Sequence, residues 1–239
     1  MIKPYKNSPG SKKEQVAVMF DNIAGKYDFM NHFFSLGIDI LWRKKAISIV
    51  AKENPGNILD VATGTGDLAL EAYAQTKAEI TGIDISAGML EIAKKKISEK
   101  GFGEKIKIVQ ADSENMPFEN ASFDAVTVAF GVRNFENLDK GLSEMYRILK
   151  PGGLAVILEF SKPTAFPFKQ LYNFSFKNIL PSIGKIFSDD KQAYTYLPDS
   201  VQAFPYGQNF LNHLSKAGFK EGKSKKLTFG IASIYTGRK

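Results

Sequence analysis

Residues 57–70 (NILDVATGTGDLAL) constrain the fold of this chain most, because an apolar run passes through a glycine-bearing turn into a helical pattern. A continuous apolar run of this kind is typical of a buried parallel strand. Gly64 and Gly66 permit positive φ angles and allow a ligand to approach the main chain closely. The segment therefore predicts a strand, a tight loop and a helix, with both glycines in a ligand-binding loop.

An acidic residue follows the next apolar run. Asp84 lies near the end of residues 79–85 and 18 positions after Gly66. In dinucleotide-binding folds, an acidic side chain about 20 positions beyond the glycines meets the ribose hydroxyls. The two features together predict a cofactor that contains a nucleoside.

The glycine loop lacks what a diphosphate needs. The helix continues Asp67-Leu-Ala-Leu, without a third glycine and without a Lys-Ser or Lys-Thr pair. Asp67 would also place negative charge in the first helical turn, where a phosphate usually binds. S-adenosylmethionine has no phosphate and carries a positive sulfonium, so it is the expected cofactor. A plain turn that binds no ligand is the alternative.

Strands and helices alternate along the rest of the chain. Ser86 is placed to cap a helix that Gly101 ends, and Pro151 stops a later helix. The other predicted elements are strands at residues 105–112, 123–130 and 154–160, a helix at 142–149 and an antiparallel hairpin at 227–238. This order predicts a doubly wound α/β fold with a seven-stranded, mostly parallel, Rossmann-like sheet, as in class I S-adenosylmethionine-dependent methyltransferases.

Length and composition favour one soluble domain. The chain has 239 residues with 44% hydrophobic content, enough for one large core. It has no cysteine, which excludes disulfides, thiolate zinc sites and thiol nucleophiles, and we expect no metal. No run of about 20 apolar residues and no signal peptide is present, so we expect a cytoplasmic protein.

The net charge differs between the parts of the expected domain. Residues 1–54, an expected helical lid, carry net charge +4, and the cofactor-binding core at 55–160 carries −5. A substrate-lid insertion at 161–200 and a C-terminal helix and hairpin at 201–239 together carry +8. Basic flanks suit nucleic acid, an anionic membrane or simple solubility. Because no RNA-binding module is present, we expect no nucleic acid partner; peripheral contact with the inner face of the membrane and a homodimer stay open.

Aromatic side chains concentrate in residues 16–42 and 166–210. Helices packed against the cofactor core would explain this distribution. A long apolar substrate pocket, or a lid that touches a membrane, would explain it equally well.

Two segments resemble the signatures of a known family. Residues 27–42 (YDFMNHFFSLGIDILW) and 147–161 (RILKPGGLAVILEFS) are similar to the signatures of the ubiquinone/menaquinone biosynthesis C-methyltransferases. Residues 130–134 and 194–200 also resemble that family, and the resemblance covers nearly the whole chain. The chain departs from the family pattern at Asp39, where histidine is usual, and at Ala129, where serine is frequent.

The resemblance implies cofactor contacts at Thr65, Asp84, Asp112 and Ser113. These positions agree with the strand ends where ligands of open α/β sheets bind. We expect Asp84 to accept both ribose hydroxyls and Asp112 to accept the adenine amino group. Asp60 begins the turn and is expected to meet the amino acid end of the cofactor, with bracing of the loop as its alternative role.

The activity that the resemblance implies is C-methylation of a prenylated demethylmenaquinol to menaquinol. Arg133 is the expected partner of the phenolate, Asn134 would hold a substrate oxygen, and Tyr27 would cover the ring or relay a proton. A ubiquinone-pathway benzoquinol substrate, an RNA methyltransferase on the same fold and a non-catalytic binding protein are the alternatives.

Overall fold

The computed structural model describes residues 2–5, 8–164, 166–167, 169–170 and 191–239. One seven-stranded sheet has the order β3-β2-β1-β4-β5-β7-β6, and β7 runs antiparallel to both of its neighbours. Its strands are β1 (Asn57–Val61), β2 (Glu79–Asp84), β3 (Ile106–Gln110), β4 (Phe123–Ala129), β5 (Leu149–Phe160), β6 (Lys220–Leu227) and β7 (Ala232–Arg238). The predicted doubly wound, mostly parallel sheet is confirmed.

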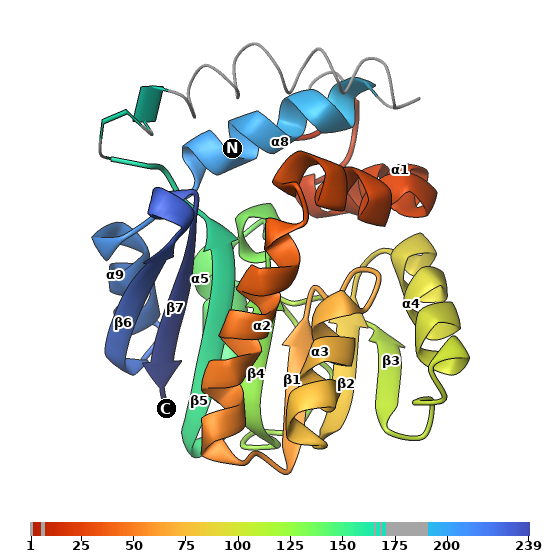
Figure 1. The fold of residues 1–239 in the computed structure, drawn as a ribbon, viewed down its shortest axis with the longest axis vertical. Coiled ribbons are helices and arrows are strands. Elements are labelled where there is room, and N and C mark those ends of the chain that lie inside the picture. Colours follow the sequence, from red (N-terminus) through yellow and green to blue (C-terminus); the bar gives the residue numbers. More distant parts are fainter. Residues whose placement is uncertain (1, 6–7, 165, 168, 171–190) are drawn as a thin grey trace.

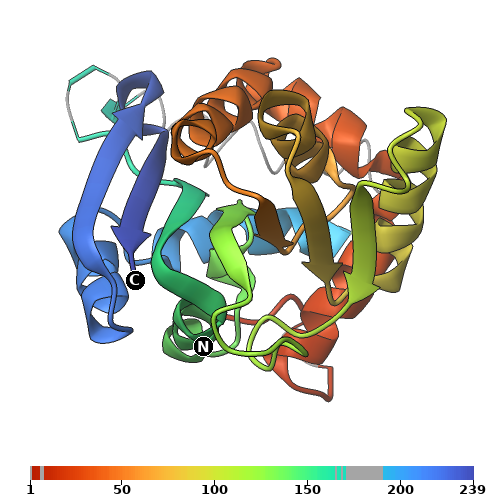
Figure 2. The same ribbon diagram turned by 90° about the horizontal axis from the view of Figure 1, so that it is seen from below.

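Helices cover both faces of the sheet (Figure 2). The helices include α2 (Ile38–Val50), α3 (Asp67–Thr76), α4 (Ala87–Glu99), α5 (Leu138–Ile148) and α9 (Gln208–Lys216) on the faces, and α1 (Lys12–Ser35) and α8 (Lys191–Ala203) at the ends of the strands. One core cluster joins α2, α3 and α4 to the sheet, and a second joins α5 and α9 to its other face. Because both faces are covered, Ile58 and Leu59 are both fully buried although they point to opposite sides.

The predicted boundaries of α4 follow from local chemistry. Ser86 caps the helix by accepting a hydrogen bond from the Met89 amide at 3.2 Å. Beyond the helix end, Gly101 adopts a φ of 72°, a conformation that favours glycine. The cap and the glycine therefore mark this helix in the sequence.

The C-terminal hairpin differs from the prediction in its first strand. β6 begins at Lys220, and residues Thr228–Gly230, which lie inside the predicted hairpin at 227–238, form a short 3-10 turn. β6 is an edge strand whose side chains are almost all exposed, so it needs no apolar face. The alternation of apolar and polar residues that marks a half-buried strand is consequently missing.

Helices α1 and α8 lie across the carboxyl ends of the parallel strands (Figure 1). α1 is joined to the start of α4 by Asp21, which accepts hydrogen bonds from the Ser86 hydroxyl at 2.6 Å and the Gly88 amide at 2.8 Å. On its other side, α1 packs against Tyr196 of α8. The predicted N-terminal lid thus covers the sheet edge where ligands of this fold bind.

Only part of the predicted insertion at 161–200 can be described. Residues 171–190 lie outside the described residues, and residues 191–200 belong to α8. Among the helices that the structure describes, none combines the length and the hydropathy needed to cross a bilayer.

Candidate active site

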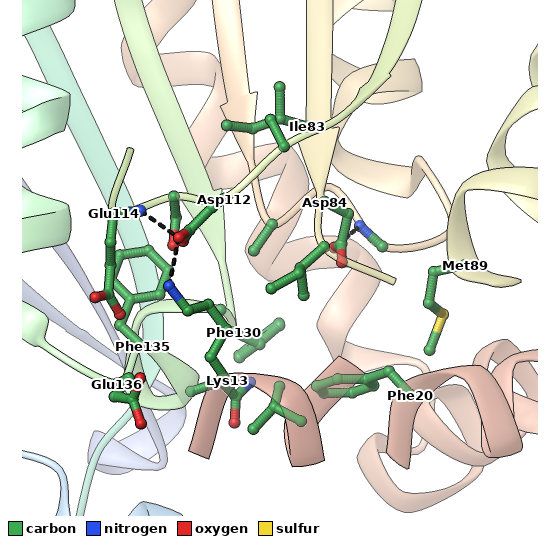
Figure 3. Close-up of a pocket in the computed structure, with 18 of the residues that line it drawn as sticks. Lys13, Phe20, Ile83, Asp84, Met89, Asp112, Glu114, Phe130, Phe135 and Glu136 are labelled. Atoms are coloured by element: carbon green, nitrogen blue, oxygen red, sulfur yellow. Dashed lines mark hydrogen bonds and ion pairs between the residues drawn. The ribbon is translucent and has the colours of Figure 1, made fainter. Parts of the chain in front are cut away.

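A cavity with about 700 Å³ of empty space lies between the strand ends and α1 (Figure 3). Its floor is formed by the segments that follow β1, β2, β3 and β4, which contribute Ala62, Asp84, Asp112 and Phe130. α1 contributes Lys13, Val16, Phe20 and Tyr27 to the opposite wall. Because β1 and β4 are adjacent, the cavity occupies the position where the strand order reverses, the usual ligand site of doubly wound sheets.

The two strongest sequence features meet in this cavity. The Asp84 carboxylate accepts hydrogen bonds from the Gly64 amide and the Ser86 amide, each at 2.9 Å. Gly64 has a φ of 56°, which explains the glycine in the loop. Burial raises the pKa of Asp84. The expected position of Asp84 beside the glycine loop is confirmed, and its contact with ribose stays a prediction.

Asp112 and Ser113 line the cavity after β3, as predicted. Asp112 accepts hydrogen bonds from the Lys13 ammonium at 2.5 Å and from the Glu114 amide at 2.9 Å (Figure 3). The hydrogen bond to Asp112 raises the pKa of Lys13. No sequence pattern indicates this pair, because Lys13 is one of many lysines and lies far from Asp112 along the chain.

Asp60 is fully buried and does not line the cavity. Its carboxylate accepts hydrogen bonds from the hydroxyls of Thr63 at 2.6 Å and Thr127 at 2.9 Å. Burial raises the pKa of Asp60 to about 7. This geometry matches the loop-bracing alternative, and contact with the amino acid end of the cofactor stays a prediction.

Thr65 and Gly66 are also placed behind the cavity wall. The Thr65 hydroxyl donates a hydrogen bond to Asp28 of α1 at 2.5 Å. Gly66 has a φ of 83°, and a Cβ atom at this position would lie 3.2 Å from the Cβ of Ala93. Both residues hold the loop against helices α1 and α4, and a direct contact of either with the cofactor stays a prediction.

Arg133 lies in a short 3-10 helix, η2 (Val132–Asn134), directly after β4. Its side chain is 6% exposed and forms an ion pair with the buried Glu159 at 2.8 Å. The guanidinium also donates to the Phe130 carbonyl and lies 5.3 Å from the Phe160 ring. Its Nε is the one buried side-chain nitrogen or oxygen among the described residues without a hydrogen-bond partner. Arg133 is therefore a fixed cation with a spare donor.

Asn134 and Tyr27 both line the cavity. The Asn134 side-chain oxygen accepts a hydrogen bond from the Tyr196 hydroxyl at 3.2 Å, which leaves its amide hydrogens as donors for a ligand. Burial raises the pKa of the Tyr27 hydroxyl, although the charge of Arg133 opposes the shift. Tyr27 therefore carries its proton at neutral pH and can donate or relay a hydrogen bond.

Sequence reasoning missed two residues of this group. Glu159 pairs with Arg133, and Tyr196 fixes Asn134. An acidic residue near the end of an otherwise apolar, buried strand is the signal that could have indicated Glu159. Tyr196 lies in the segment 194–200, but its spacing carries no sign of its partner.

The charge of the cavity fits S-adenosylmethionine. Four carboxylates and one ammonium group line it, from Asp84, Asp112, Glu114, Glu136 and Lys13. This excess of negative charge disfavours phosphates and favours a cation with hydroxyl and amino donors.

Residues 8–239 match the model of the ubiE/COQ5 methyltransferase family. The chain belongs to this family. It is 49% identical over 239 residues to a demethylmenaquinone methyltransferase of Bacteroides fragilis, covering 100% of this chain and 97% of that protein. A ubiquinone/menaquinone biosynthesis C-methyltransferase of Geotalea daltonii is 48% identical over 230 residues, covering 95% of this chain and 97% of that protein.

Solved structures share the fold of this ubiE/COQ5 family member at low sequence identity. The cyclase SpnF has a TM-score of 0.71 at 16% identity, with 97% of each chain covered. A S-adenosylmethionine-dependent methyltransferase of Thermotoga maritima has a TM-score of 0.66 at 20% identity, with 93% of this chain and 99% of that chain covered. The family membership confirms the predicted enzyme class and cofactor: this protein is a S-adenosylmethionine-dependent methyltransferase.

Proposed function

We propose that this enzyme methylates a ring carbon of prenylated demethylmenaquinol and so forms menaquinol in menaquinone biosynthesis. The names of its relatives in Bacteroides fragilis and Porphyromonas gingivalis, which are demethylmenaquinone methyltransferases, support this substrate. The observation that carries the proposal is the buried Arg133 with its unpaired Nε–H, because an ionised hydroquinone oxygen is the acceptor that such a donor fits.

Ionisation of the substrate drives the reaction. When bound, S-adenosylmethionine supplies an electrophilic methyl group on a sulfonium. A hydroquinone that loses a phenolic proton becomes nucleophilic at the neighbouring ring carbon. The charge of Arg133 lowers the pKa of that phenol and stabilises the phenolate, so no strong base is required.

Asn134 and Tyr27 orient the ring. The amide hydrogens of Asn134 are available to the second substrate oxygen, since Tyr196 occupies its carbonyl oxygen. Tyr27 approaches from α1 and, in its protonated form, donates to a substrate oxygen or passes the departing proton to solvent. Alignment of the ring carbon with the methyl group is then the main contribution of these residues.

Mass analysis of products tests the substrate directly. We expect a mass gain of one methylene after incubation of the protein with S-adenosylmethionine and reduced demethylmenaquinone. A ubiquinone-pathway benzoquinol is the second candidate, because relatives such as that of Geotalea daltonii are named for both pathways. Methylation of the benzoquinol alone would exclude our assignment, and salt-dependent tRNA binding with tRNA methylation would move the enzyme to another class.

We also propose a peripheral contact with anionic membrane, where a prenylated quinol dissolves. Leu36, in the turn between α1 and α2, is 85% exposed, and Leu41, in the first turn of α2, is 64% exposed. Exposed Lys44 and Lys45 follow within one helical turn. Apolar side chains beside basic ones suit the surface of anionic lipid. Flotation with anionic but not neutral vesicles is the expected result, and L36S/L41S should abolish it.

Light scattering separates a monomer from the homodimer that the sequence leaves open.

A further inference from the structure

A second cavity, with about 570 Å³ of empty space, adjoins the cofactor cavity. The two cavities share Phe135 and Glu136 in their walls. Asn134 lines the cofactor cavity and Arg133 lines the second one, so η2 forms the border between them. The far wall comes from α8, which crosses this end of the sheet near the beginning of the chain (Figure 1).

The lining of this second cavity is mainly apolar. Its apolar side chains come from the N-terminal segment, η2, α5 and α8 with the residues after it, namely Ile2, Val132, Leu138, Ala203, Phe204 and Pro205. A ligand that fills this space would therefore be stabilised mostly by burial of hydrocarbon.

The polar groups of the second cavity already have partners. The Lys12 ammonium donates to the carbonyls of Arg133 at 3.0 Å and Phe135 at 2.7 Å. The Ser200 hydroxyl donates to the Leu197 carbonyl at 2.8 Å. The spare Nε–H of Arg133 is the exception among the described residues, and Arg133 itself lines this cavity. A ligand with one anionic oxygen and a long hydrocarbon part matches this distribution.

We propose that the second cavity binds the first isoprene units of the quinol tail. The inference rests on the proposed function and assigns a binding site to the tail of the proposed substrate. With the ring at the border formed by Asn134 and Arg133, the phenolate reaches the Arg133 guanidinium, and the adjoining ring substituent enters the second cavity. Ala203 and Leu138, in the apolar wall of the cavity, then determine the preference of the enzyme for a prenylated substrate over a short-chain one.

Two neighbouring residues of α8 provide a matched test. Ala203 lines the cavity and Gln202 does not, although both are exposed near the end of the helix. Ala203→Trp should fill the cavity, and Gln202→Trp adds the same bulk outside it. Leu138→Trp narrows the cavity from α5 and supplies a second variant if the first does not fold.

The assay compares reduced demethylmenaquinone carrying two isoprene units with an analogue carrying an ethyl group. We expect Ala203→Trp to lower kcat/KM for the prenylated substrate by about tenfold or more, and for the ethyl analogue by less than about twofold. Gln202→Trp should change neither, and calorimetry should find the wild-type Kd for S-adenosylmethionine in all variants. Equal losses on both substrates, or no loss on either, would overturn the tail site. If the wild-type enzyme methylates neither quinol, the proposed function itself fails.

Discussion

Replacement of Arg133 by lysine tests the central role assigned to this side chain. The guanidinium has two separate tasks: it pairs with Glu159 and the Phe130 carbonyl, and it retains an Nε–H for the substrate. Lysine keeps the positive charge that the buried Glu159 requires, but its ammonium is a point charge and cannot replace the fork of donors. Arg133→Lys should therefore leave the fold intact and remove the donor that stabilises the phenolate.

The magnitudes separate the two tasks. Loss of one donor to a developing oxyanion lowers kcat by about 10²–10³-fold, or about 3–4 kcal/mol in activation free energy. Loss of one internal hydrogen bond lowers the free energy of unfolding by only about 1 kcal/mol. The Kd for S-adenosylmethionine should not change, because Arg133 does not line the cofactor cavity.

Turnover of reduced demethylmenaquinone, calorimetry with S-adenosylmethionine and urea unfolding measure these three quantities. Arg147→Lys is the matched control: Arg147 pairs with Glu144 at 2.7 Å and lines neither cavity, so its replacement should cost stability but not turnover. Normal turnover in Arg133→Lys would refute the phenolate role. So would a loss of activity that follows entirely from weaker cofactor binding.

Three further outcomes are expected. Asp84→Ala should weaken S-adenosylmethionine binding by about 2 kcal/mol or more in calorimetry, the scale of charge-assisted hydrogen bonds; wild-type affinity would remove Asp84 from the site. Tyr196→Phe, which frees the Asn134 oxygen, should lower kcat by about fivefold with unchanged cofactor Kd; unchanged kcat would contradict this role. Because burial raises the pKa of Asp60 to about 7, the wild-type free energy of unfolding should fall as the pH rises from about 4 to about 7, since the native state still holds the Asp60 proton that the unfolded chain has released. Asp60→Asn should flatten that slope in urea titrations, and an equal slope in both proteins would contradict it.

The sequence predicted those parts of the site that depend on strand ends. Gly64, Asp84 and Asp112 follow apolar runs, and parallel strands bring their carboxyl ends to one edge of the sheet. The charge of Asp67 was likewise informative, since it pairs with Arg43 at 3.1 Å and with Lys96, which fills the helix start with protein groups and leaves no place for a phosphate.

Contacts between distant segments could not be predicted in this way. The pairing of Arg133 with Glu159 depends on the parallel register of β4 and β5, and the pairing of Lys13 with Asp112 depends on how α1 crosses the sheet. The aromatic segment at 16–42 divides between core and cavity: Trp42 is buried in the core, whereas Phe20 and Tyr27 line the cofactor cavity. Its predicted role in a substrate pocket or a lid stays a prediction. Packing fixes the direction of each side chain, and this direction decides which residues of one segment face the core and which face the cavity.

Helix α1 contacts the surroundings of the cofactor cavity through Lys13, Asp21 and Asp28, which recur about every two helical turns and so share one face. Their partners are Asp112, the start of α4 and Thr65, all beside or within the cofactor site. We therefore expect movement of this helix and exchange of the cofactor to be coupled. By thermodynamic linkage, a quinol that holds α1 in place tightens the cofactor, and the cofactor tightens the quinol by the same factor. We expect release of the demethylated cofactor to involve movement of α1, and product exchange is then a step that can limit the turnover rate.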